Sequence, residues 1–159
     1  MTVTTKKISP CLWFDNRIEE AVNFYVAVFG GKILSTTYYN DAGPLPKGTV
    51  LMMTFALHDE EFMALNGGQQ MEYTHAVSFL VKCKDQAEVD KYWNALTSDG
   101  GEEIECSWLK DKYGVRWQIA PTVLLEYVSD KDPERAKRAM QAMYKMKKID
   151  IAAIEKAVG

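Results

Sequence analysis

The sequence contains two stretches with the same order of structural signals, about 70 residues apart, and this repeat limits the fold more than any other feature. Each stretch begins with a short apolar run typical of a β-strand and continues into a helical stripe of apolar residues that ends at paired glycines. Further β-type runs follow in each stretch. The sequence therefore predicts two βαβββ modules, residues 8–68 and 75–128, in the α+β class.

Capping signals predict where the helices begin. Asn16 with Glu19, and Asp85 with Glu88, have the spacing of a capping box. In the tail, residues 132–158, an aspartate followed by proline predicts one helix start and Asp150 predicts a second. The strands expected in module one are residues 8–14, 33–39, 49–57 and 61–65, and those expected in module two are residues 75–81, 102–109, 115–120 and 124–128.

The segment 105–118 carries a strong hairpin signal. A half-aromatic run ends at Trp108, a short polar link contains Asp111 and closes on Gly114, and the next run alternates between two faces. Two strands joined by a tight turn are the expected result.

Composition and charge exclude several classes of partner. The 159 residues are 47% hydrophobic and 26% charged, as in an ordinary globular protein, and the net charge of −3 comes without a basic stripe, so we expect no nucleic-acid partner. No apolar run approaches the roughly 20 residues of a membrane span, and no signal peptide is recognisable. Three cysteines without metal-type spacing indicate reduced thiols and a cytoplasmic location.

Several motifs resemble one family. They are LWFD (12–15), AVNFY (21–25), ALNGG (64–68), WLKDKYG (108–114), WQI (117–119) and KIDIA (148–152). With the repeated module, they make the chain similar to the PhnB-like group, also called the 3-demethylubiquinone-9 3-methyltransferase domain, of the vicinal oxygen chelate superfamily. That superfamily includes glyoxalase I, extradiol dioxygenases and bleomycin-resistance proteins. The resemblance implies a single domain over residues 1–159, a cavity between paired sheets for a small-molecule ligand, and a homodimer.

The same resemblance implies where a divalent metal would be held. In metal-using members His and Glu side chains from the strands bind the ion, which acts as a Lewis acid. Carried onto this chain, the positions fall at Ser9 or Pro10, at residues 64–66, at His75 and at Gln118. Only His75 is a usual ligand, and Gln118 replaces a carboxylate. We therefore expect a degenerate metal site at His75 and Gln118, with a bound divalent ion as the alternative.

The candidate site residues each have two interpretations. His75 and Gln118 are the catalytic candidates, because a histidine can act as a general base near neutral pH, but His75 could also be a strand-start histidine bonded to a carbonyl. Cys106 could be a nucleophile or a buried thiol. Four aromatic residues could line a ligand cavity or belong to the core: Trp13, Phe55, Trp108 and Trp117.

The functional hypothesis that follows is a small-molecule-binding protein of undetermined specific activity. A divalent-metal-dependent lyase, isomerase or oxygenase is the alternative, and a 3-demethylubiquinone methyltransferase is a third. The methyltransferase interpretation lacks the glycine-rich loop after a first strand that usually holds a methyl donor such as S-adenosylmethionine.

Overall fold

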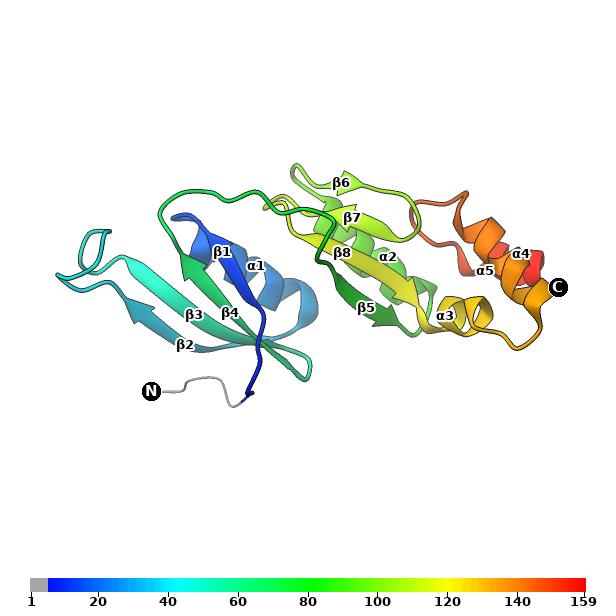
Figure 1. Cartoon of the computed structure of the whole chain (residues 1–159), viewed down its shortest axis with the longest axis horizontal. Helices are drawn as coiled ribbons and strands as arrows, with labels where there is room; N and C mark the ends of the chain where they lie inside the picture. The colour runs from blue at the N-terminus through cyan, green and yellow to red at the C-terminus, as the bar shows by residue number, and fades with distance from the viewer. Residues whose placement is uncertain (1–5) are drawn as a thin grey trace. The chain divides into compact units, whose positions relative to one another are not determined.

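The computed structural model describes residues 6–159, which form two compact units, one ending at Glu72 (unit 1) and one beginning at Tyr73 (unit 2). Unit 1 contains β1 (Cys11–Phe14), α1 (Ile18–Phe29), β2 (Lys32–Tyr38), β3 (Val50–Leu57) and β4 (Glu60–Asn66). Unit 2 contains β5 (Phe79–Cys83), α2 (Gln86–Thr97), β6 (Glu102–Glu103), β7 (Trp108–Lys110), β8 (Arg116–Pro121), α3 (Thr122–Val128), α4 (Pro133–Met143) and α5 (Ile151–Val158) (Figure 1).

The two units share one topology, which confirms the predicted repeat of a βαβββ module. The sheet of unit 1 has the strand order β1-β4-β3-β2, and that of unit 2 has the order β5-β8-β7-β6. In each sheet the first strand pairs in parallel with the last strand, and the other pairs are antiparallel. A parallel pair needs a long crossover, and the helix and the two intervening strands provide it in both units.

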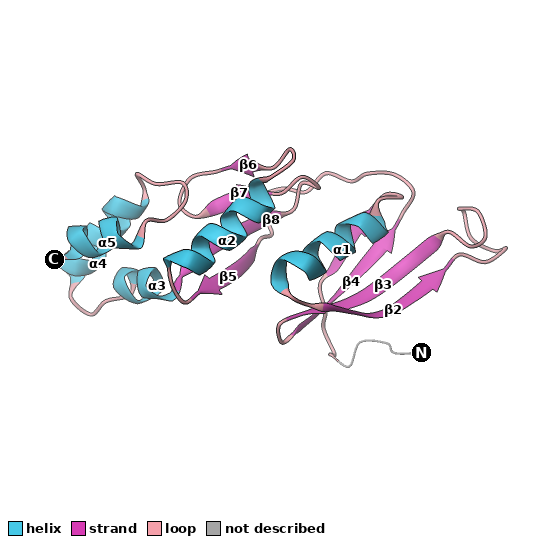
Figure 2. Ribbon diagram, turned by 180° about the vertical axis from the view of Figure 1, so that it is seen from behind, coloured by secondary structure: helices cyan, strands magenta, loops and turns pink. Residues whose placement is uncertain are grey.

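Each sheet has one face covered by a helix of its own unit. In unit 1, α1 packs its buried side chains, among them Tyr25, onto the sheet, and in unit 2 α2 does so with Trp93. Figure 2 shows α1 and α2 each lying over a sheet. Figure 1 shows the opposite faces, and among the described residues no helix of the same unit lies over either of them. We call these opposite faces the open face of unit 1 and the open face of unit 2.

Three helix starts, at Asp85, Asp132 and Asp150, have the side-chain caps that the sequence predicts, and one does not. The Asp85 carboxylate accepts from the backbone N–H of Glu88, and Asp150 caps α5 in the same way through Ala153. The expected cap at Asn16 is wrong: α1 begins at Ile18, after Arg17, with no side-chain cap. The side chain of Asn16 instead accepts from Asn66, a contact across the unit that a local spacing rule cannot predict.

The strand predictions need three corrections in unit 2. Residues 124–128 belong to helix α3, whose Leu124 is buried in a cluster with the tail residues Ile149 and Ile154. The expected strand 102–109 is divided, because Cys106 and Ser107 adopt φ values of 58° and 75° that interrupt the extended chain. The strand expected from residue 75 begins only at Phe79, which leaves His75 in a turn.

No helix in the described part of the chain is long and apolar enough to cross a membrane.

Candidate functional site

The register of β7 and β8 decides which side chains share the open face of unit 2. Trp108 pairs with Gln118, and Leu109 pairs with Trp117. Successive side chains of a strand point to opposite faces, and both Leu109 and Trp117 are buried on the side of α2. The half-buried Trp108 and Gln118 therefore lie on the open face. Arg116, two residues before Gln118, shares that face.

His75 lies beside this group although it is outside the strands. Its Nδ1 accepts a hydrogen bond from Nε of Arg116 at 3.4 Å, and its ring meets the ring of Trp108 edge to face, with centroids 5.8 Å apart. An accepting nitrogen carries no proton, so the ring proton in this arrangement is on Nε2. The interpretation of His75 as a strand-start histidine bonded to a carbonyl is wrong, because its partner is an arginine.

The donor atoms at His75 and Gln118 do not fit a metal centre. A catalytic zinc site normally has three protein ligands, and among residues 6–159 no three His, Cys, Asp or Glu side chains gather in an arrangement suited to a metal ion. The positively charged guanidinium of Arg116 donates to Nδ1 of His75 and so occupies the lone pair that a metal ion would need there. The Gln118 amide nitrogen donates to the Ser78 hydroxyl at 2.8 Å, which leaves its neutral oxygen as the acceptor.

Trp117 is buried next to a buried carboxylate, on the face away from His75. Its Nε1 donates to Oδ2 of Asp111 at 2.8 Å, and the backbone N–H groups of Tyr113 and Val115 donate to Oδ1 of Asp111 at 2.9 and 3.1 Å. Asp111 is 1% exposed. The carboxylate thus holds the β7–β8 turn and the Trp117 ring in one arrangement.

Trp13 is a half-buried aromatic residue on the open face of unit 1. It pairs with Leu65 of β4, and its Nε1 donates to the carbonyl of Gln69 at 2.7 Å. A Cβ atom on Gly67 would lie 1.7 Å from the Trp13 ring, so the indole lies directly on this glycine. Phe55 has the opposite orientation: it is fully buried and stacks on Tyr25 of α1.

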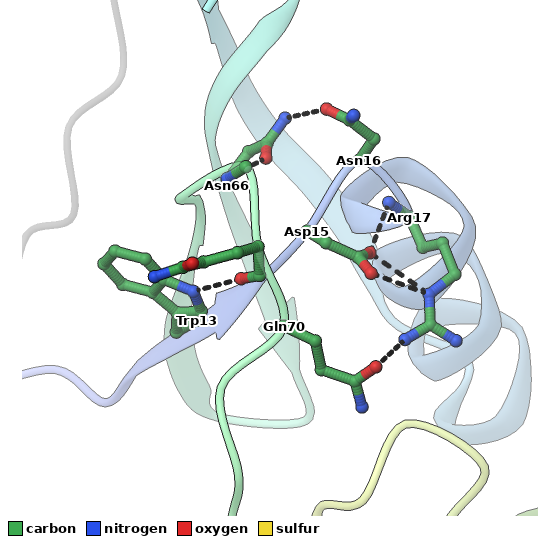
Figure 3. A network of polar contacts seen from close by, with 8 residues as sticks. Trp13, Asp15, Asn16, Arg17, Asn66 and Gln70 are labelled. Atoms are coloured by element: carbon green, nitrogen blue, oxygen red, sulfur yellow. Dashed lines mark hydrogen bonds and ion pairs between the residues drawn. The ribbon is translucent and has the colours of Figure 1, made fainter. Parts of the chain in front are cut away.

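A polar network fixes the chain around Trp13 (Figure 3). The Asp15 carboxylate accepts from the backbone N–H and Nε of Arg17, and Nη2 of Arg17 donates to Gln70 at 3.0 Å. Burial alone would raise the pKa of Asp15, but the hydrogen bonds and charge of Arg17 outweigh it and lower that pKa. The buried Asn66 donates to Asn16 and accepts from the backbone of residue 68. These polar side chains bind one another and the nearby backbone, so they stabilise the local structure and do not form a metal or ligand site.

The cysteines offer no activated nucleophile. Burial raises the pKa of Cys11 and of Cys106, and burial followed by the nearby charges of Glu88 and Asp85 raises the pKa of Cys83 to about 12. A reactive cysteine has a lowered pKa instead. Cys106 therefore fits the interpretation as a structural thiol.

Two residues of this region were absent from the sequence-based candidates. Arg116 could have been found from the alternation of the run 115–119, which places it on the same face as Gln118. Asp111 was noted only as a turn residue, and its burial depends on the long-range position of Trp117. Sequence patterns do not give such a contact.

Comparison with known proteins places the chain in a family. A family profile described as 3-demethylubiquinone-9 3-methyltransferase matches residues 6–120. A PhnB protein from Bacillus cereus that carries the same methyltransferase description is 34% identical and has a TM-score of 0.64, and the match covers 74% of this chain and 100% of that chain. No curated protein matches the sequence.

More distant structures share the fold. A Pseudomonas aeruginosa protein is 21% identical with a TM-score of 0.58, and the match covers 71% of this chain and 95% of that chain. The fosfomycin resistance protein FosX from Mesorhizobium loti is 11% identical with a TM-score of 0.52, over 72% of this chain and 90% of that chain. The chain therefore belongs to the PhnB-like family described as 3-demethylubiquinone-9 3-methyltransferase.

Proposed function

We propose that this protein binds a small organic molecule on the open face of unit 2. The observation that carries the proposal is the gathering of four side chains of different chemistry on or beside that face: His75, Trp108, Arg116 and Gln118. Binding sites for small molecules combine aromatic surface with a few placed polar groups, and this group has both.

Trp108 and Gln118 would contact the ligand in different ways. Trp108 offers a half-exposed ring on which a planar ligand can lie, and its position is fixed by β7 and by the edge of His75. Gln118 offers its amide oxygen as an acceptor, because its nitrogen already donates to Ser78. Trp13 offers a second, separate aromatic surface in unit 1. Phe55 and Trp117 support the strands from the helix-covered faces, because both are buried.

Metal-dependent chemistry is not part of the proposal. The fold family implies a divalent ion, but the donors around His75 do not fit one, and the cation Arg116 already donates to Nδ1 of His75. No observation at the site favours a lyase, isomerase or oxygenase over simple binding.

We also propose a homodimer located in the cytoplasm. The support for the dimer is the resemblance to the superfamily together with the half-exposed apolar side chains of the open face of unit 1, Trp13, Met52, Met63 and Leu65. The support for the location is the set of three free cysteines. Sedimentation equilibrium tests the dimer, which predicts about twice the monomer mass of 18.0 kDa. A single species at the monomer mass would contradict it.

A metabolite screen tests the binding proposal. Thermal unfolding of the full chain is measured with each compound of a library, and the affinity of each hit is then measured by calorimetry. We expect Trp108→Ala to weaken a hit about tenfold, since a stacked aromatic contact contributes about 1.4 kcal/mol.

Tyr144→Ala is the matched control, because it removes a 61% exposed aromatic side chain outside the site and should leave the affinity unchanged. Equal affinities in wild type and Trp108→Ala would contradict the placement of the site.

The methyltransferase description predicts a different result. A methyl donor is usually held in a doubly wound parallel sheet, whereas each sheet here is mixed and four-stranded. We expect S-adenosylmethionine to give no saturable heat of binding in calorimetry at millimolar concentration. Saturable binding would support a methyltransferase and contradict this part of the proposal.

A further inference from the structure

The charge of Arg116 is not neutralised by a carboxylate. Arg17 and Arg135 each lie 3.1 Å from the carboxylate of a nearby aspartate. Arg116 donates instead to Nδ1 of His75 and to the carbonyl of Gly114, which are both uncharged acceptors. Within residues 6–159 Arg116 forms no ion pair. A half-buried arginine without a counterion, on a candidate binding face, is a site for an anion.

The carboxylate of Glu102, which the charge of Arg116 reaches, is already bound to another cation. Glu102 lies 2.6 Å from Nζ of Lys110, its partner across β6 and β7. The hydrogen bond and charge of Lys110 lower the pKa of Glu102, and the charge of Arg116 adds a smaller effect in the same direction. Lys110 and Arg116 are two cations, and Glu102 is one anion, so these three groups together carry a net positive charge.

The two bonds of Arg116 also orient it. Its Nε and Nη1 are both engaged, so the plane of the guanidinium is fixed and Nη2 remains without an acceptor in the described chain. Next to it, His75 has its proton on Nε2, which is a second donor. The contact between the His75 and Trp108 rings places the imidazole beside an aromatic surface. Two donors suit the two oxygens of a carboxylate.

We propose that the ligand of the open face of unit 2 is a planar aromatic carboxylate, with its ring on Trp108 and its carboxylate bound by Arg116 and His75. This inference rests on the proposed binding function and names the class of ligand. The bonds to His75 and Gly114 hold the guanidinium before the ligand arrives, which reduces the entropy lost on binding.

A pair of compounds that differ only in charge tests the inference. Calorimetry on the full chain measures the affinities of 2-naphthoate and of its neutral counterpart 2-naphthamide. We expect the acid to bind at least about tenfold more tightly at low salt, and this preference to shrink as salt screens the charge. In Arg116→Gln the affinity of the acid should fall to that of the amide.

Two further variants make the result specific. Arg138→Gln removes an arginine of α4 that donates to the carbonyl of Val158, and it should keep the preference for the acid. His75→Ala changes an exposed turn residue, so it should fold normally and lose part of the preference. It also provides the test if Arg116→Gln does not fold.

The outcomes separate this inference from the proposed function. If acid and amide bind wild type equally and Trp108→Ala weakens both, the binding face stands and the anion preference is wrong. If the acid is preferred equally in Arg116→Gln and in wild type, another group selects the charge and the inference is wrong. If neither compound binds at about 1 mM, the ligand class is wrong, and the metabolite screen decides the proposed function by itself.

Discussion

At the scale of single residues, the lack of a side chain at Gly67 decides where the Trp13 ring can lie. Gly67 does not have a positive φ, so its backbone would accept another residue, but a Cβ atom there would collide with the Trp13 ring. The close approach of the Trp13 indole, which itself donates to the carbonyl of Gln69, thus explains the first glycine of the ALNGG motif, Gly67.

Gly67→Ala should displace the Trp13 indole. The new Cβ would lie 1.7 Å from Cζ2 and 2.1 Å from Cε2 of the ring, so the ring must move and its bond to Gln69 must break. We expect a loss of about 1–3 kcal/mol in the free energy of unfolding, measured by urea denaturation. In a Trp13→Ala background the same substitution should cost far less. Equal costs in the two backgrounds would contradict this account of the glycine.

Asp111→Ala should destabilise unit 2. The substitution leaves three buried donors without their acceptor, namely two backbone N–H groups and the indole of Trp117. An unsatisfied buried donor costs about 1–3 kcal/mol, and we expect a total of about 3 kcal/mol after local relaxation. Asp41→Ala, which removes an exposed carboxylate paired with Lys47, should cost less than about 0.5 kcal/mol. Similar unfolding midpoints for the two variants would rule out the structural role of Asp111.

Residue-level prediction from sequence worked where a strand pattern carried the information. The sequence nominated Trp108 and Gln118, and the structure places both on one open face. It did not separate them from Phe55 and Trp117, because alternation gives two faces without saying which one a helix covers. That choice depends on how α1 and α2 pack, which is set by contacts distant in the sequence.

At the level of elements, the predicted order βαβββ is correct in both units, and the main error is α3. Its residues are rich in β-branched and aromatic side chains, which favour a strand, yet Leu124 is buried against α4 and α5. Tertiary burial outweighed the local preference. The tail helices were predicted correctly because Asp132, Pro133 and Asp150 are local signals that act within one turn.

Side chains of α2 tie the tail to the rest of unit 2, and Asp90 does so through an ion pair with Lys148 at 3.0 Å. Gln86 donates to the carbonyl of Ile149 at 3.0 Å and accepts from the backbone N–H of Ile151 at 2.8 Å. The preceding tail carbonyls accept from the backbone of Cys106 and Ser107, at 2.8 and 2.9 Å. These two residues have positive φ, so the tail stabilises the unusual turn that leads into Trp108.

Gln86→Ala should loosen this turn. Two hydrogen bonds to the tail are lost, and we expect the amides of Cys106, Ser107 and Ile151 to exchange with solvent faster, while the free energy of unfolding falls by about 1–2 kcal/mol. Hydrogen exchange measured by mass spectrometry reports both units at once. Gln141→Ala, an exposed change on α4, serves as the control. Unchanged exchange at residues 106 and 107 would show that Gln86 does not hold the tail.

For the whole molecule, family membership covers the two modules and not the tail. The family profile ends at residue 120, at the end of the repeated modules, and α3, α4 and α5 follow it. Membership therefore accounts for the mixed sheets and their open faces. Membership does not name a ligand, and our proposal for one rests on single residues such as His75 and Arg116.

The measurement that tests the central claim most directly is a titration followed through the indole N–H signals of the four tryptophans in a ¹H–¹⁵N spectrum. Each hit from the metabolite screen is added to the full chain. The account predicts a saturable shift of the Trp108 signal, while Trp93, which is 1% exposed and donates to Glu103, does not move. A saturable shift of Trp93 with no change at Trp108, or no compound that moves any signal, would contradict a binding site on the open face of unit 2.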